Sequence, residues 1–397
     1  MDILFALLVL LLVTRIGADV AVRVGQPALV GELMGGIVVG LVISLTPGAH
    51  GGIAEVTADR AFESLLDLAV FFLMLTAGLE MRLKDLTGSG KTSVPIAVAG
   101  MVLPFGLGFA LGWYWLPASG QQFAQALFLG VAMAITAVPV AVKVLMDLGK
   151  LQTGIGKVVV AAAVIDDILS LILLAVLTSV LSADESLTMA GLAMIVLKVG
   201  LFFVVAMGVG RLLLPRAGRL IGKVAVEHAE FSLVIVFGLL LAVVAEFLDM
   251  HFMIGAFAAG VLFTRSVAGE DVYEQVRGQI EALTLGFLAP VFFASIGLHL
   301  DPRALAEIPL FVLVLILIAT AGKFVGAGAT ARLVGLDTRD AIAVGAAMNA
   351  RGAVEIIIAD IALRAGLFDA EVPAIQYMFS AVVIMAIVTT LMSPILL

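Results

Sequence analysis

The sequence predicts an all-α polytopic membrane protein with about thirteen membrane-spanning helices, arranged as two inverted six-helix repeats whose broken helices cross. Three features predict this fold class: the composition, the succession of apolar segments and the distribution of basic residues. Of the 397 residues, 62% are hydrophobic and 13% are charged, and the mean hydropathy is +1.22. A soluble protein could not bury that much apolar surface, so the chain must lie in a bilayer.

The composition also excludes several classes of function. The chain has no cysteine, which rules out disulfides and thiolate metal sites. The sequence shows no nucleophile elbow, no phosphate-binding loop, no ATP-binding motif and no basic face of the kind that binds nucleic acid. We therefore expect no enzymatic activity, no cofactor and no nucleic-acid partner, and we expect an ion gradient to be the energy source.

Thirteen apolar segments follow one another with short loops between them, and most approach the roughly 20 residues that a membrane-spanning helix requires. The first begins directly after Asp2, without the basic start of a secretory signal, and is therefore counted as a span. The predicted spans are 2–14, 28–46, 61–79, 92–115, 124–146, 158–182, 187–210, 229–247, 250–264, 282–299, 307–331, 341–363 and 374–395.

The basic residues test this count of spans. Of the 22 lysines and arginines, sixteen fall on one side of the membrane, three on the other and three at membrane depth. Cytoplasmic loops carry the excess of positive charge in membrane proteins. The C-terminus is therefore predicted in the cytoplasm and, with an odd number of spans, the N-terminus outside. The predicted location is the inner, cytoplasmic membrane.

The seventh span separates two halves of six spans, so a repeat of the first half would lie inverted in the membrane. The fifth and twelfth spans then correspond, and both are interrupted. The fifth contains Pro139, which removes a backbone donor and clashes with the preceding turn, and the twelfth contains the polar stretch 348–352. Two broken helices at matching positions indicate a substrate site near the midplane of a secondary transporter.

Two adjacent carboxylates, Asp166 and Asp167, lie near the middle of the apolar stretch 161–177. One charged side chain at the bilayer centre costs roughly 2.5–3.5 kcal/mol on insertion scales, which packing does not repay. Adjacent residues lie about 100° apart around a helix, so one carboxylate can pair with a neighbour while the other faces water. This pair is therefore the candidate ion- and proton-binding site.

Lys323 lies in the eleventh span with apolar residues on both sides. A nearby carboxylate would keep its ammonium charged, so we expect a lysine–aspartate pair. A pair that a competing cation or proton can break would couple the two ions. The alternative is a static ion pair that holds two helices together. We favour coupling, because a static pair would need only one aspartate.

Four further polar residues accompany the interruptions. Arg351 and Glu355 are spaced i, i+4 and can pair on one helix face, where a structural role in rigidifying the break is favoured. Asn349 and Thr136 could donate oxygen ligands where the two breaks cross. They could equally satisfy backbone groups that the interruptions leave free.

Seven motifs then connect the chain to a known family. In order they are QPALVGELMGGIVVG (26–40), LMLTAGLEMRLKDL (73–86), ITAVPVAVKVLMDLGKL (135–151), AAAVIDDILSLILLAV (161–176), IGAFAAGVLF (254–263), PVFFASIGLHLD (290–301) and MNARGAVEIIIA (348–359). Each motif is weak alone, but together they resemble the monovalent cation:proton antiporter superfamily. The resemblance is to its branch of bacterial Na⁺/H⁺ and K⁺/H⁺ antiporters.

The resemblance implies roles for individual residues and segments. Asp167 would bind the transported cation and the proton in competition, Asp166 would pair with Lys323, and exchange of sodium or lithium would be electrogenic. A core transport domain would move against a dimerisation domain in a homodimer surrounded by lipid. The implied segments are 1–80 and 229–299 for dimerisation, 92–182 and 307–395 for transport, and 187–214 as a linker helix.

Three alternatives to a sodium exchanger remain open. The first is a K⁺/H⁺ antiporter of the efflux type, with its regulatory domain naturally absent or removed. The second is a symporter for an organic anion on a similar fold, which a Lys323 without an aspartate partner would suit. The third is a membrane sensor without transport. The intact set of two aspartates and one lysine argues against the sensor, because nothing would maintain three costly charges.

Overall fold

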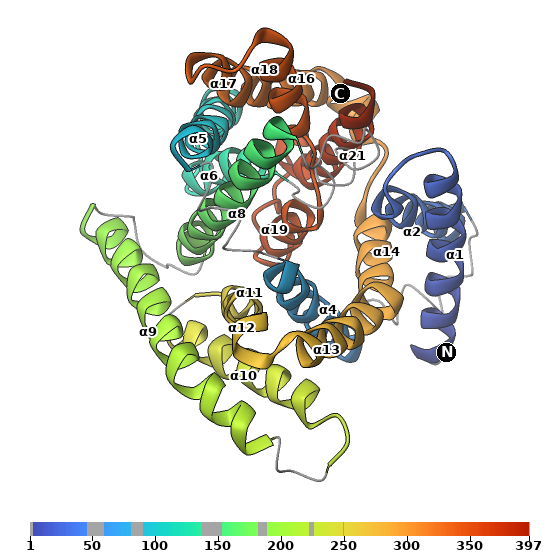
Figure 1. The fold of residues 1–397 in the computed structure, drawn as a ribbon. Helices are drawn as coiled ribbons and strands as arrows, with labels where there is room; N and C mark the ends of the chain where they lie inside the picture. Colours follow the sequence, from blue (N-terminus) through green and yellow to red (C-terminus); the bar gives the residue numbers. More distant parts are fainter. Residues whose placement is uncertain are drawn as a thin grey trace. The chain divides into compact units, whose positions relative to one another are not determined.

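The computed structural model describes residues 3–45, 59–80, 90–136, 153–181, 189–221, 226–248 and 250–396. Within these residues the secondary structure is helical and contains no strand (Figure 1). The chain divides into two compact units, each built from segments that are distant in the sequence.

The first unit combines residues 1–23, 28–83 and 182–298. Its α2 packs against α1, and α11 packs against α4 and α10. The helices are α1 (Ile3–Arg23), α2 (Ala28–Leu45), α4 (Arg60–Glu80), α9 (Met189–Ile221), α10 (Ala229–Phe247), α11 (Phe252–Leu262), α12 (Arg265–Ala268), α13 (Glu270–Leu283), the π-helix η2 (Thr284–Leu288) and α14 (Ala289–His299).

The second unit combines residues 24–27, 84–181 and 299–397 and contains the candidate site. In it α8 packs against α5 and α6, and α16 packs against α5 and α21. The helices are α5 (Gly90–Trp115), α6 (Gln122–Ala134), α8 (Gly154–Leu181), α15 (Ala304–Glu307), α16 (Pro309–Lys323), the π-helix η3 (Phe324–Ala329), α17 (Thr330–Leu333), α18 (Thr338–Ala347), α19 (Ala353–Arg364), α20 (Pro373–Gln376) and α21 (Met378–Leu396).

Most helices overlap the predicted membrane spans. Among the described residues, seven helices are long and apolar enough to cross a membrane, and five shorter helices are also apolar. The predicted twelfth span, 341–363, is divided into α18 and α19, as its polar stretch indicated. An all-helical membrane fold with an interrupted twelfth span therefore follows from the sequence.

The first span differs from its prediction. The sequence analysis ended it at residue 14, but α1 continues to Arg23. The helix can include Arg15 because the guanidinium lies 3.6 Å from the Glu32 carboxylate of α2 and also donates to the Leu285 carbonyl. Arg23 pairs in turn with Asp19 one turn earlier, at 2.7 Å. Hydropathy alone does not reveal such pairs, and the predicted span therefore ended just before the first arginine.

Candidate functional site

The two aspartates of α8 occupy different environments. The Asp166 side chain is fully buried, whereas Asp167 is partly exposed. This difference follows from the rotation of about 100° between successive helix positions. One aspartate thus belongs to the interior of the second unit, and its neighbour is not completely covered by protein.

Lys323 is the buried cation next to Asp166. Its Nζ lies 3.5 Å from Asp166 Oδ1, and both side chains are completely shielded from solvent. The same ammonium donates to Thr136 Oγ1 at 2.7 Å and to the Ala134 carbonyl. Ala134 is the last residue of α6, where carbonyls have no helical partner and carry partial negative charge. The ammonium therefore makes two hydrogen bonds, one to a hydroxyl and one to a carbonyl at a helix end, and its contact with the carboxylate is an ion pair at 3.5 Å.

Lys323 also occupies a special place in its own helix. It is the last residue of α16, and the π-helix η3 begins at the next residue, Phe324. Short π-helical turns inside longer helices are rare and occur frequently at functional sites. Here the wider turn starts directly after the side chain that pairs with Asp166.

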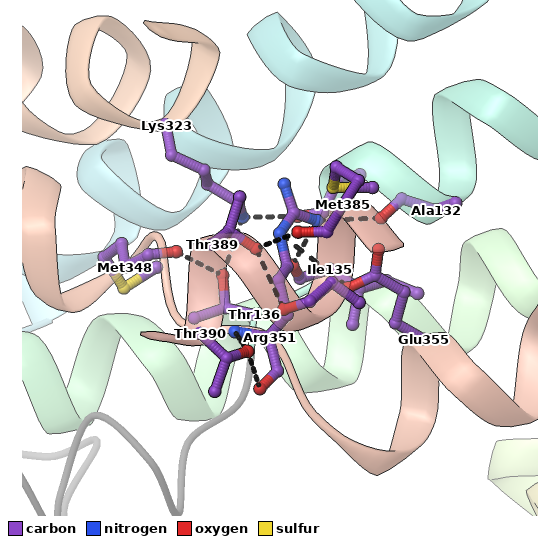
Figure 2. A network of polar contacts seen from close by, with 12 residues as sticks. Ala132, Ile135, Thr136, Lys323, Met348, Arg351, Glu355, Met385, Thr389 and Thr390 are labelled. Atoms are coloured by element: carbon purple, nitrogen blue, oxygen red, sulfur yellow. Dashed lines mark hydrogen bonds and ion pairs between the residues drawn. The ribbon is translucent and has the colours of Figure 1, made fainter. Parts of the chain in front are cut away.

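The end of α6 and the interruption between α18 and α19 meet at Thr136. The helix α6 ends at Ala134, Ile135 has extended backbone, and Thr136 follows outside the helix. The Thr136 hydroxyl accepts from Lys323 and donates to the Met348 carbonyl at 3.1 Å, which lies just after the end of α18 (Figure 2). A direct hydrogen bond thus links the end of α6 to the interruption in the twelfth span. The rest of the predicted fifth span, 137–146, lies outside the described residues.

Arg351 joins the same two segments from the other side. Its fully buried guanidinium donates through Nη1 to the carbonyls of Ala132 and Ile135, at 2.7 and 2.9 Å (Figure 2). Its Nε lies 3.8 Å from Glu355 Oε2, and Glu355 is in the first turn of α19, where a negative charge is favoured. Arg351 therefore caps the end of α6 and pairs within its own segment.

Several buried polar atoms of this site accept or donate no hydrogen bond within the described part of the chain. They include both carboxylate oxygens of Asp166 and of Glu355, both amide atoms of Asn349, and Nε and Nη2 of Arg351. Buried polar groups are normally paired, and leaving one unpaired costs about 1–3 kcal/mol. Such a group of oxygen atoms suits a small hard cation, a proton or water, all of which are bound by oxygen.

Pro139 was predicted to support the break in the fifth span, and it lies outside the described residues. The other predicted site residues belong to the second unit, on α6 and its end, on α8, on α16 and around the α18–α19 interruption. Their roles in binding and coupling stay predictions, because the geometry shows contacts and not ion occupancy.

Sequence reasoning missed a group of hydroxyls on α21. Thr390 Oγ1 donates to the Arg351 carbonyl at 3.0 Å, and the Arg351 N–H donates back to it at 3.3 Å (Figure 2). Ser393 Oγ donates to the Ala346 carbonyl at 3.2 Å. The available signal was three hydroxyl residues within five positions, 389–393, of a mostly apolar final segment.

A helical membrane protein in which a helix end and an interrupted helix meet beside a buried carboxylate–lysine pair has the architecture of a secondary transporter. The sequence matches the family described as "Sodium/hydrogen exchanger, transmembrane" over residues 3–397. The chain belongs to this family. It is therefore a membrane-spanning antiporter that exchanges a monovalent cation, sodium in the family's description, for protons, as the sequence predicted.

Individual relatives agree with this assignment. The chain is 33% identical to the Na⁺/H⁺-K⁺ antiporter GerN of Bacillus cereus, over 99% of this chain and 95% of the relative. It is 29% identical to a Na⁺/H⁺ antiporter of Enterococcus hirae, over 100% and 97% of the two chains. Its structure is similar to that of the sodium proton antiporter MjNhaP1 of Methanocaldococcus jannaschii, with a TM-score of 0.74 at 18% identity, covering 100% and 99%. The last comparison confirms the predicted fold.

Proposed function

We propose that sodium or lithium and protons compete for one site in the second unit, with Asp167 as the carboxylate that binds either ion. Asp166 and Thr136 supply further oxygens, and Lys323 couples the two ions through its pair with Asp166. The observation that carries this proposal is the fully buried Lys323–Asp166 pair at the point where the end of α6 meets the α18–α19 interruption.

Competition follows from the chemistry of a carboxylate. A carboxylate that reaches water binds a proton or a cation, and occupation by one excludes the other. Exchange results if the loaded site changes its access from one side to the other and the empty, charged site does not. Asp167 is partly exposed and Asp166 is buried, which suits the first for taking ions from water and the second for pairing with Lys323.

The Lys323 ammonium rests among the same kind of oxygens that a cation would use. Its partners are a carboxylate oxygen, a hydroxyl and a carbonyl at the end of a helix. A sodium ion entering this group would compete with the ammonium for Asp166 and Thr136. Binding of the cation would therefore weaken the lysine pair, and release of the cation would restore it.

Transport of potassium is the second candidate. GerN, at 33% identity, is named as a Na⁺/H⁺-K⁺ antiporter. Selectivity between the two ions depends on the number and field strength of the oxygens that replace the hydration shell. Discrimination against potassium would come from Asp167, Thr136 and the carbonyls of the broken segments.

The assembly and topology belong to the same proposal. We place the protein as a homodimer in the inner membrane, surrounded by lipid, with the N-terminus outside and the C-terminus in the cytoplasm. The distribution of basic residues, sixteen against three, supports this orientation. The second unit would be the part that carries the ions, because it holds all the site residues among those described.

Proton flux in proteoliposomes with an imposed pH gradient tests the proposal. Sodium, lithium and potassium are added in turn to wild type, to Asp167→Asn and to the control Asp271→Asn, whose carboxylate is exposed on α13. We expect sodium to release protons in wild type and control but not in Asp167→Asn. Flux in Asp167→Asn equal to wild type would remove Asp167 from the site. No response to any monovalent cation in wild type would contradict the exchange itself.

A further inference from the structure

We propose that Thr390 and Ser393 of α21 are positioning residues that hold the α18–α19 interruption from both ends and thereby set the cation selectivity of the site. This inference rests on the proposed function, because it concerns the same oxygens. Neither hydroxyl needs to touch the ion. Each acts through the backbone of the interrupted segment.

Thr390 holds one end of the interruption. Its hydroxyl contacts both polar groups of the Arg351 backbone, accepting from the N–H at 3.3 Å and donating to the carbonyl at 3.0 Å. Arg351 lies outside both helices, so these groups lack the partners that a continuous helix would give them. A single buried side chain thus replaces the missing helical hydrogen bonds of one residue.

Ser393 holds the other end. It follows Thr390 by three positions, so the two hydroxyls lie on the same face of α21. Its Oγ donates to the Ala346 carbonyl in the last turn of α18, at 3.2 Å. The same carbonyl accepts from the Asn349 N–H at 3.2 Å. One turn of α21 therefore contacts the backbone on both sides of the interruption, at Ala346 near the end of α18 and at Arg351 shortly before α19.

The position of Arg351 is transmitted to the ion site. Its guanidinium binds the Ala132 and Ile135 carbonyls, and the next residue, Thr136, contacts Lys323. A shift of the Arg351 backbone would therefore move the end of α6 and the oxygens that surround the lysine ammonium. Because selectivity depends on how many oxygens reach the ion and at what distance, it should respond to the hydrogen bonds of Thr390.

The neighbouring residue provides a matched control. Thr389 is also fully buried, but its hydroxyl donates within α21, to Met385 at 2.8 Å and to Ala386 at 3.2 Å (Figure 2). Valine at either position keeps the shape of threonine and removes the hydroxyl. The two substitutions differ in one respect: only Thr390→Val frees the backbone of the interrupted segment.

The experiment compares wild type, Thr390→Val, Thr390→Ser, Thr389→Val and Asp167→Asn in proteoliposomes. For each variant we measure the half-saturating concentrations of sodium, lithium and potassium and the maximal rates. The expected effect is an increase of roughly 2- to 10-fold in half-saturating sodium, which corresponds to about 0.4–1.4 kcal/mol. We expect this increase, with a changed sodium-to-potassium ratio, in Thr390→Val. Thr390→Ser and Thr389→Val should remain close to wild type.

Equal behaviour of Thr390→Val and Thr389→Val would overturn the inference, because packing rather than the hydrogen bonds would then decide. So would failure of Thr390→Ser to restore the wild-type ratio. If Thr390→Val does not fold, Ser393→Ala against Ser393→Thr makes the same comparison at the other end. If sodium drives proton flux in wild type but not in Asp167→Asn, the proposed function holds even where this inference fails. Wild type without flux contradicts both.

Discussion

One buried lysine of this protein has its ammonium surrounded by oxygen atoms. Lys323 contacts Asp166, Thr136 and the end of α6, and it is completely shielded from solvent. A buried ion pair is weak evidence for stability by itself, because desolvation offsets the attraction. Such a pair is recognised by the large loss of folding stability that follows when only one partner is removed.

We therefore predict that Lys323→Gln and Asp166→Asn each lower the free energy of unfolding by about 3–5 kcal/mol, since each leaves one buried charge uncompensated. The double variant should lose less than the sum of the two. Thermal unfolding in detergent measures all three, with the exposed Lys157→Gln on α8 as control. Additive losses would mean that the two side chains do not interact.

Another carboxylate, Asp301, is partly exposed, unlike the buried Asp166. Asp301 lies between α14 and α15, and the Arg303 side chain and backbone N–H hydrogen bond to it, which holds the pKa of Asp301 below its usual range. The folded pKa is depressed, so the stability it contributes is present above the unfolded pKa. It is lost as the pH falls through the folded pKa.

We predict that Asp301→Asn lowers stability at neutral pH by less than about 1 kcal/mol, since exposed ion pairs contribute little. The difference from wild type should vanish at pH values below the folded pKa, where the wild-type carboxyl is also neutral. Unfolding followed between neutral and acidic pH measures this. A difference that persists at the acidic end would assign the effect to something other than ionisation.

At the scale of elements, two helices of the first unit approach each other through glycine. A Cβ atom built on Gly31 of α2 would lie 2.1 Å from the Gly17 carbonyl oxygen of α1. Small residues permit this close approach, which is typical of packed membrane helices. Because the obstacle is backbone, no side-chain rotation can relieve it.

We predict that Gly31→Ala destabilises the protein by about 1–3 kcal/mol, as overpacking does in closely packed interiors. Gly200→Ala on α9 is the matched control, because nothing lies within 4 Å of its Cβ position. There the substitution should be neutral or stabilise the helix slightly, by up to about 1 kcal/mol. Equal melting temperatures for the two variants would show that α1 and α2 separate freely.

The helices also show which features could be predicted from the sequence and which could not. The interruption at 348–352 was predictable, because polar residues and a glycine within an apolar run favour a broken helix. The end of α1 was not predictable, because Arg15 is accommodated by Glu32, which hydropathy cannot pair with it. The roles of the Thr390 and Ser393 hydroxyls were not predicted for a similar reason, because their hydrogen-bond partners lie 39 and 47 residues earlier in the chain.

At the scale of the whole molecule, the site residues divide into a group that balances its charge and a group that does not. Arg351 and Glu355 are one cation and one anion, fixed within one segment. Asp166, Asp167 and Lys323 carry a formal net charge of −1 when no ion is bound. One bound sodium ion brings this group to zero, whereas two bound protons bring it to +1. A cycle that exchanges two protons for one sodium ion therefore moves one net charge across the membrane.

We therefore predict that the exchange is electrogenic. A membrane potential should then change its driving force, because one elementary charge is worth about 2.3 kcal/mol per 100 mV. Sodium-driven proton flux should respond to a potential imposed with potassium and valinomycin. In Asp166→Asn each bound ion, sodium or one proton, gives the remaining pair the same charge, so any residual exchange should be electroneutral and insensitive to the potential. Asp271→Asn should respond as wild type does. A wild-type flux that ignores the potential would show that Asp166 does not carry a proton through the cycle, and Lys323 would then have no more than the static role that its burial already explains.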